Sequence, residues 1–253
     1  MTDALLVQHL SKRFGTRQAV DNVSFAINIG DVLGFLGPNG AGKSTTMRML
    51  TGFLPPDNGT IAVFGQDLQK STQAVQTLIG YVPEGAPLYG DMTVYEFLQF
   101  ICAARGVLKS RRALALYDAA EKTALHEVLD QRIETLSKGY KRRAALASAL
   151  VHNPPLLILD EPTDGLDPNQ KHTMRALIKA LSAEKAILIS THILEEVDAV
   201  CTRALILAEG RVRYLGTAAG LRTAADVPQP ARLEDVFRSL TQIQPPMQQR
   251  SAA

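Results

Sequence analysis

One glycine-rich stretch of the chain has the residue types and the spacing needed to bind phosphate. It matches the motif in which a glycine is followed by any four residues and then by glycine, lysine and serine, and a threonine follows the serine. Its members are Gly37, Pro38, Asn39, Gly40, Ala41, Gly42, Lys43, Ser44 and Thr45. Glycines allow backbone N–H groups to turn toward phosphate oxygens, Lys43 can reach the β- and γ-phosphates, and the Ser44 hydroxyl can bind Mg²⁺. The stretch predicts a site for a nucleoside triphosphate with Mg²⁺; a glycine-rich turn that matches by chance is the alternative.

The segments on either side of this loop can hold it in place. The apolar run 32–36 predicts a buried strand, and residues 46–50 predict a helix that begins at the loop. A helix starting here directs the positive end of its dipole at a bound phosphate. The loop therefore has the strand–loop–helix setting that this motif requires.

Two adjacent carboxylates follow a second apolar run. Residues 156–159 predict a short buried strand, and Asp160 and Glu161 come directly after it. This places both acids at the edge of the sheet where open α/β folds bind ligands. Asp160 can hold Mg²⁺ through water, and Glu161 can polarise a water that attacks the γ-phosphate. The alternative is a strand that simply ends in solvated acids.

The remaining segments predict an α/β fold with a P-loop NTPase core, a flanking antiparallel β-sheet and an inserted helical subdomain. Predicted strands for the flanking sheet are 5–10, 23–29 and 60–64, and a hairpin joins 204–208 to 211–215. Helices are predicted from the Thr93 and Glu96 capping pattern, between 110 and 128, from about 138 to 151, and after Asp167 and Pro168.

The predicted domain division follows from these elements. Residues 1–220 form one nucleotide-binding domain, with the helical insert at 85–150 inside it. Residues 221–244 form a short helical extension, because apolar positions between Leu233 and Leu240 have helical spacing. The polar stretch 245–253 is predicted to be disordered.

Composition excludes several classes of protein. The 27 basic and 25 acidic side chains leave a formal net charge of +2, so no nucleic-acid partner is expected. Cys102 and Cys201 are distant in sequence, which suits a reducing cytosol. No apolar run approaches the ~18–20 residues of a membrane span, and the N-terminus does not resemble a secretory signal. We expect a soluble intracellular chain, whose work at any membrane would need another polypeptide to supply the span.

A third motif indicates the family. The stretch Leu-Ser-Lys-Gly-Tyr at 136–140 resembles the signature sequence of ATP-binding cassette (ABC) proteins. Together with the phosphate loop, Asp160-Glu161-Pro162-Thr163, Gly165-Leu166-Asp167-Pro168 and Ser190-Thr191-His192, the resemblance covers roughly residues 4–215. It implies a head-to-tail dimer of two cassettes that encloses two ATP molecules. Ser137 and Gly139 would then contact the γ-phosphate held by Lys43 of the other cassette.

The resemblance also implies individual roles. His192 is similar to the switch histidine that contacts the γ-phosphate, and Phe14 to the aromatic residue that stacks on adenine. Glu84 lies where the family usually has a glutamine, and an acid there could orient water or Mg²⁺. Without the resemblance, Ser137 and Asp167 are ordinary helix N-caps, His192 is a surface group, and Phe14 is a core or surface residue.

Two parts of the chain depart from the usual ABC pattern. Lys138 and Tyr140 replace glycine and glutamine in the signature, and Glu84 replaces glutamine. These variants are similar to cassettes of the ABC-2 export class, including the gliding-motility-associated type. The resulting hypothesis is the ATPase subunit of an exporter, peripheral at the cytoplasmic face of the inner (plasma) membrane, with a second cassette and a separate permease. A soluble cassette acting on ribosomes or nucleic acid and an unrelated phosphoryl-transfer enzyme remain as alternatives.

Overall fold

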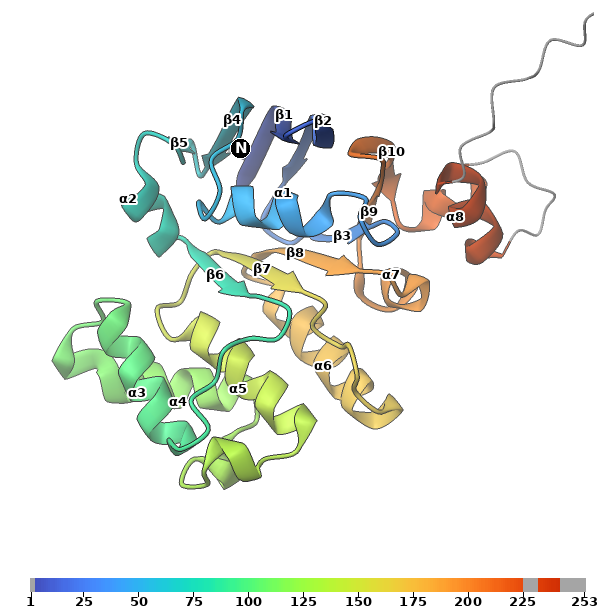
Figure 1. The fold of residues 1–253 in the computed structure, drawn as a ribbon. Coiled ribbons are helices and arrows are strands. Elements are labelled where there is room, and N and C mark those ends of the chain that lie inside the picture. Colours follow the sequence, from blue (N-terminus) through green and yellow to red (C-terminus); the bar gives the residue numbers. More distant parts are fainter. Residues whose placement is uncertain (1–2, 225–231, 242–253) are drawn as a thin grey trace, which may run out of the picture.

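Two β-sheets lie on opposite sides of helix α1 (Lys43–Leu50), as Figure 1 shows. The computed structural model describes residues 3–224 and 232–241. The smaller sheet is antiparallel in the order β2-β1-β4-β5. Its strands are β1 (Leu5–Phe14), β2 (Arg17–Ile27), β4 (Asn58–Val63) and β5 (Gln66–Asp67). This sheet confirms the predicted antiparallel layer beside the core.

The larger sheet carries the phosphate loop. Its order is β10-β9-β3-β8-β7-β6, and every neighbouring pair is parallel except β9 with β10. The strands are β3 (Val32–Leu36), β6 (Ile79–Val82), β7 (Leu156–Asp160), β8 (Ala186–Thr191), β9 (Arg203–Ala208) and β10 (Arg211–Thr217). Parallel strands end at a common edge, so the loops that follow β3, β6, β7 and β8 meet there.

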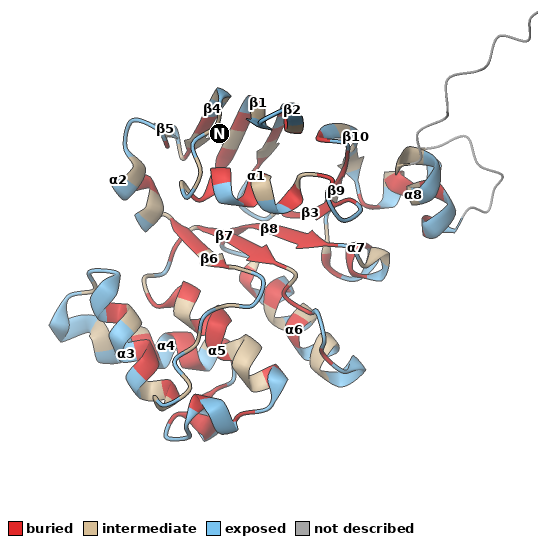
Figure 2. Ribbon diagram, in the orientation of Figure 1, coloured by how far each residue is buried: buried red, intermediate tan, exposed pale blue. Residues whose placement is uncertain are grey.

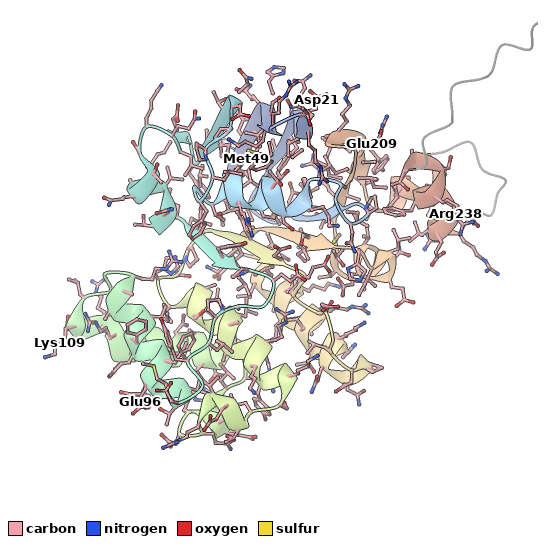
Figure 3. The ribbon with its side chains drawn as sticks, viewed as in Figure 1. Asp21, Met49, Glu96, Lys109, Glu209 and Arg238 are labelled. Carbon is pink, nitrogen blue, oxygen red and sulfur yellow. The ribbon has the colours of Figure 1, made fainter. Side chains whose placement is uncertain are left out.

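A layer of helices covers the other face of this sheet. Between β6 and β7 the chain forms α3 (Val94–Ala104), α4 (Arg112–Lys122) and α5 (Lys138–Leu150), and α6 (Pro168–Leu181) follows β7. Thr93 and Glu96 make the predicted capping box at the start of α3, and Figure 3 labels Glu96 in this insert. Asp167 caps α6 by accepting a hydrogen bond from the Gln170 N–H, with Pro168 at the first helical position.

Alternation along the central strands divides the core into two layers. Leu156 and Ile158 of β7 pack with α1 and the antiparallel sheet, whereas Leu157 and Leu159 pack with the helical layer. Figure 2 shows these strands buried along their length. A strand buried on both faces needs apolar residues at every position, which explains the uninterrupted runs in the sequence. Asp160 continues the series 156, 158, 160 and therefore lies on the α1 side.

A third, smaller core lies beside β9. Helices α7 (Leu194–Val200) and α8 (Leu233–Thr241) meet here with the short helix Ala219–Thr223. Leu36, Val197, Ile206 and Val236 are fully buried in this cluster. The apolar face of α8 therefore packs in the same cluster as α7, the helix that follows β8. The division of the chain into residues 1–220 and 221–244 stays a prediction, and the predicted tail 245–253 lies outside the described residues.

The helix predicted between 110 and 128 is present as α4, which is shorter than that interval. Lys109–Arg111 form a 3₁₀ turn, α4 ends at Lys122, and a second 3₁₀ turn spans His126–Val128. Ala124 has a φ of 51°, which is left-handed and cannot continue an α-helix. The short helix α2 (Thr72–Thr77) has no counterpart in the sequence prediction. None of the described helices combines the length and the apolar character that crossing a bilayer requires.

The histidine that follows α5 gives the fold a dependence on pH. Burial of the His152 ring, aided by the charge of Arg105, lowers its pKa to about 4, and its Nε2 lies 3.1 Å from the Ile79 carbonyl oxygen. The unfolded ring, with an ordinary pKa of about 6.5, binds a proton at a pH where the folded ring does not. Stability therefore falls as pH drops from about 7.5 to 5, by about 2 kcal/mol.

Urea denaturation of His152→Gln at these two pH values tests this expectation. The variant should lose most of the decrease between about pH 7.5 and 5, because glutamine does not titrate. His172→Gln, at an exposed position of α6, should keep the decrease of the unmodified chain. An unchanged pH dependence in His152→Gln would assign the effect to other groups.

Candidate nucleotide-binding and hydrolysis site

The predicted site residues converge at one edge of the larger sheet. The phosphate loop follows β3, Glu84 follows β6, Asp160 ends β7, and His192 follows β8. The register pairs Asp160 with Ser190 and Leu36 with Thr191, so these loops begin at the same level of the sheet. Four segments that are distant in sequence therefore form one site.

Two glycines of the phosphate loop are required by close contacts with the backbone. Gly42 has a φ of 108°, and a Cβ added to it would lie 2.3 Å from the Ala19 carbonyl oxygen. A Cβ on Gly37 would lie 2.3 Å from the Leu207 carbonyl oxygen. Any side chain at either position would displace a strand, so the loop geometry depends on these glycines. Buried Ala41 anchors the loop, because its carbonyl accepts a hydrogen bond from the Gly210 N–H.

The loop holds its lysine in a partly buried position. Lys43 is 8% exposed, and its Nζ donates to the Gly37 carbonyl at 2.6 Å and the Pro38 carbonyl at 3.3 Å. Burial lowers the pKa of the ammonium group, while the carboxylates of Glu161, Asp160 and Glu84 act in the opposite direction. Three predicted acids thus lie within electrostatic reach of Lys43, a cation on which phosphate oxygens can replace the carbonyls.

Asp160 is fixed by the neighbouring strand. The Ser190 hydroxyl donates a short hydrogen bond to its Oδ1, and both residues are nearly or fully buried. Ser190 was not predicted as a site residue; its place opposite Asp160 depends on strand pairing that the sequence does not reveal. The bond holds one carboxylate oxygen, and Asp160 lines a cavity together with Ser44 of the phosphate loop.

Glu161 and His192 are in direct contact. His192 Nδ1 lies 3.0 Å from Glu161 Oε2, and the Glu161 side chain is 11% exposed against 52% for His192. Glu161 has a φ of 49°, a left-handed conformation that costs a non-glycine residue about 1–2 kcal/mol. Its N–H lies 3.1 Å from the Ser190 carbonyl oxygen, a contact that helps hold this conformation. The sharp turn after β7 aims the carboxylate at the histidine.

Two cavities adjoin the phosphate loop. A cavity of about 440 Å³ joins the half-exposed ring of Phe14 to Gly40, Gly42 and Lys43. Asn39, Ser44 and Thr45 line it as well. Arg17, which the sequence analysis missed, also lines this cavity and donates a hydrogen bond to the Gly40 carbonyl at 3.0 Å. Its only sequence signal is its position three residues after Phe14.

The second cavity shares Ser44 and Arg48 with the first. It measures about 500 Å³ and brings Ser44, Glu84 and Asp160 together, with Arg48 and Tyr81 in its wall. Burial, with the nearby charge of Asp160, raises the pKa of Tyr81 to about 12, so its hydroxyl keeps its proton. The three residues predicted to hold Mg²⁺ therefore line the same cavity.

The signature residues lie apart from these cavities. Ser137 is the N-cap of α5 and accepts a hydrogen bond from the Tyr140 N–H at 3.4 Å. A Cβ added to Gly139 would lie 2.7 Å from the Gln170 side chain, so α5 and α6 meet closely at their N-termini. Neither Ser137 nor Gly139 lines a cavity beside Lys43.

The two signature departures have structural partners. The Nζ of Lys138 lies 2.7 Å from the position that a Cβ on Gly165 would occupy, so its side chain crosses to the loop before α6. The Tyr140 ring stacks under the Arg143 guanidinium, with 4.1 Å between the guanidinium carbon and the ring centre. Both contacts add packing at the start of α5 that the usual residues, glycine and glutamine, would not provide.

The family model described as ABC transporter matches residues 20–164. The chain belongs to the ABC transporter family. The ABC transporter ATP-binding protein YxlF of Bacillus subtilis is 38% identical over 212 residues, which cover 84% of this chain and 70% of that protein. The Nod factor export ATP-binding protein I of Paraburkholderia xenovorans is 36% identical over 248 residues, 94% of this chain and 82% of that protein.

Solved structures agree with this assignment. An ATP-binding subunit of an ABC transporter has a TM-score of 0.83 and 30% identity, covering 94% of this chain and all of that one. The protein cbiO1 of Clostridium perfringens, part of the ABC transporter complex cbiONQ, has a TM-score of 0.80 and 28% identity over 88% of this chain and 92% of its own. This chain is an ATP-binding subunit of the exporter type and an ATPase. The soluble ribosomal or nucleic-acid alternative finds no support in these comparisons.

Removal of the loop lysine tests the nucleotide site. Lys43→Ala should weaken ATP binding roughly 10- to 100-fold, because hydrogen bonds to a charged group contribute about 1.5–3 kcal/mol. Titration with a fluorescent ATP analogue measures the affinity, and Lys179→Ala at an exposed position of α6 is the control. Equal affinities for both variants would remove Lys43 from phosphate binding.

Proposed function

We propose that this chain supplies ATP hydrolysis to an exporter whose permease is a separate polypeptide, and that it lies peripherally at the cytoplasmic face of the inner membrane. The observation that carries the proposal is the meeting of Lys43, Asp160, Glu161 and His192 at one sheet edge. Relatives named for Nod factor export and linearmycin resistance support the direction of transport. The cbiO1 structure, described as part of a transporter complex, supports a membrane partner.

The two cavities suggest how ATP lies across the loop. Adenine would stack on Phe14, and the phosphates would extend along the N–H groups of residues 37–45 toward Lys43. The Lys43 ammonium would then exchange its two carbonyl partners for the β- and γ-phosphates. Arg17, in the same cavity as Phe14, is placed to contact the ribose or the α-phosphate.

The residues beside Lys43 fit a magnesium ion. Mg²⁺ in nucleotide sites is bound by one or two carboxylates, a hydroxyl, water and phosphate oxygens. Ser44 and Asp160 would hold the ion in the cavity they share, with Glu84 facing it or an ordered water. Among the described residues no three His, Cys, Asp or Glu side chains form a metal cluster, so water and phosphate must complete the coordination. Bound there, Mg²⁺ would neutralise charge on the β- and γ-phosphates.

Hydrolysis would use the contact between Glu161 and His192. Glu161 accepts a proton from water, the water oxygen bonds to the γ-phosphorus, and the bond to the bridging oxygen breaks to release ADP. His192 lies 3.0 Å from Glu161 and is half-exposed, and in this proposal it would contact the γ-phosphate. Glu161 is nearly buried, so its orientation toward the histidine is maintained before nucleotide arrives.

A second cassette would complete the site. Ser137 is exposed at the N-terminus of α5, where its hydroxyl, the free N–H groups and the helix dipole favour binding of a phosphate. Since it lies outside the cavities beside Lys43 of its own chain, the phosphate it would contact belongs to a second copy bound head to tail. ATP would then stabilise the closed dimer by binding both partners, and hydrolysis would reopen it.

The permease would dock where core and insert meet. A cavity of about 420 Å³ separates them, with Phe53, Tyr81 and Pro83 on the core side and Phe97 and Ile101 of α3 on the insert side. Pro83 precedes Glu84, so this apolar groove adjoins the cavity at Asp160. A permease helix bound here would contact both parts and respond to movement between them.

Conversion of Glu161 to its amide separates binding from chemistry. Glu161→Gln should bind ATP normally, lose hydrolysis by about 10²–10⁴-fold, and accumulate dimers with ATP. Phosphate release and light scattering after size-exclusion chromatography measure the two effects. The double variant with Lys43→Ala should stay monomeric. Hydrolysis at the normal rate by Glu161→Gln would remove this carboxylate from the mechanism.

An added charge at the signature tests dimer closure. In the Glu161→Gln background, Ser137→Arg should block ATP-dependent dimerisation and leave monomer affinity within about twofold, because the arginine occupies the space of the incoming phosphate. The control is Glu127→Arg, which introduces the same arginine side chain at another exposed position of the insert. Dimers of Ser137→Arg with ATP would contradict the head-to-tail arrangement.

A further inference from the structure

A buried carboxylate lies directly behind the histidine loop. Glu196 of α7 is 2% exposed, and the Thr191 hydroxyl donates to its Oε2 at 2.6 Å. The same hydroxyl accepts a hydrogen bond from the Ile193 N–H at 3.1 Å. Thr191 and Ile193 are the neighbours of His192 on either side. One chain of hydrogen bonds therefore ends at Glu196 and fixes the backbone that carries the histidine.

The side chains of the last two residues of β8 lie on opposite faces of the sheet, because side chains alternate along a strand. Ser190 follows Ala186 and Leu188 on the α1 side, where it binds Asp160. Thr191 follows Ile187 and Ile189, which face the helical layer. The Thr191 side chain therefore lies on the side of the helical layer, where Glu196 of α7 accepts its hydrogen bond.

Two polar atoms near this contact have no hydrogen-bond partner within the described part of the chain. They are Oε1 of Glu196 and Nε of Arg175, and both atoms are buried. Arg175 lies on α6, which packs against α7. Burial raises the pKa of Glu196, while the charges of Arg175 and Lys171 lower it and that of Glu161 raises it. The two orphan atoms thus belong to a carboxyl group and a guanidinium group that lie on facing helices.

Buried polar groups without hydrogen-bond partners are costly, and a shift that brings these two groups together would relieve the cost. Each unsatisfied group disfavours the arrangement, more so when it is charged. A displacement of α6 against α7 that brings Arg175 to Glu196 would satisfy both groups at once. The N-terminus of α6 contacts α5 through Gln170 and Gly139, so movement of the signature helix reaches this pair.

We propose that Glu196 is a positioning residue for ATP hydrolysis, which holds the loop 191–193 so that His192 meets Glu161, and that it pairs with Arg175 when the second cassette closes. The inference rests on the proposed roles of Glu161 and His192. Glu196 touches neither the nucleotide cavities nor Lys43, so it acts through the histidine.

Steady-state ATPase kinetics of the full chain test the role. Glu196→Gln should keep KM within about twofold and lower kcat roughly tenfold, because the amide keeps its size but cannot pair with Arg175. Glu195→Gln, the exposed neighbour on the same helix, should behave as the unmodified chain. Thr191→Val should lower kcat in the same way, and Thr191→Ser, which keeps the hydroxyl, should restore it.

A double-mutant cycle separates positioning from general stability. If Glu196 acts through His192, Glu196→Gln should have no further effect on kcat in a His192→Ala background. A tenfold loss in both backgrounds, or a kcat for Glu196→Gln within twofold of the unmodified chain, would overturn the inference. If Glu196→Gln does not fold, the Thr191→Val and Thr191→Ser pair decides by the same cycle. An unmodified chain without ATPase activity would instead refute the proposed function.

Discussion

The fixed register of the parallel sheet is the constraint on which the site depends. Each strand carries residues toward two faces, and every parallel strand ends at the same edge. Pairing of Leu36 with Thr191 and of Asp160 with Ser190 sets the level of three loops at once. A slip of one residue in β7 would turn Asp160 toward the helical layer and away from the phosphate loop.

Electrostatic balance is the second feature that connects the site. Lys43 is a nearly buried cation among Asp160, Glu161 and Glu84, and its ammonium group donates to two carbonyls of its own loop. A triphosphate brings more negative charge into a place that already has three acids. Mg²⁺ and the ammonium group must offset it together, so binding of ATP and of the ion should be strongly coupled.

Local patterns predicted much of the fold and of the site, and long-range contacts account for what they missed. The glycine pattern, the Thr93 capping box and the Asp167 N-cap depend on residues a few positions apart, and each is present in the structure. The contacts of Ser190 with Asp160 and of Thr191 with Glu196 depend instead on strand pairing and on helix packing. Nothing in the spacing of these residues distinguishes them from ordinary strand ends and surface acids. Helix α4 is shorter than the predicted interval because one left-handed residue, Ala124, stops an otherwise continuous pattern.

The small core beside β9 connects helix α8 with the loops of the candidate site. Leu233 and Val236 of α8 share that core with Val197, the residue next to Glu196, and with Leu36, the last residue before the phosphate loop. A chain cut before Leu233 would leave this apolar surface open to water and loosen the support of both loops. Helix α8 therefore supports, from outside the nucleotide pocket, the residues that precede the phosphate loop and follow His192.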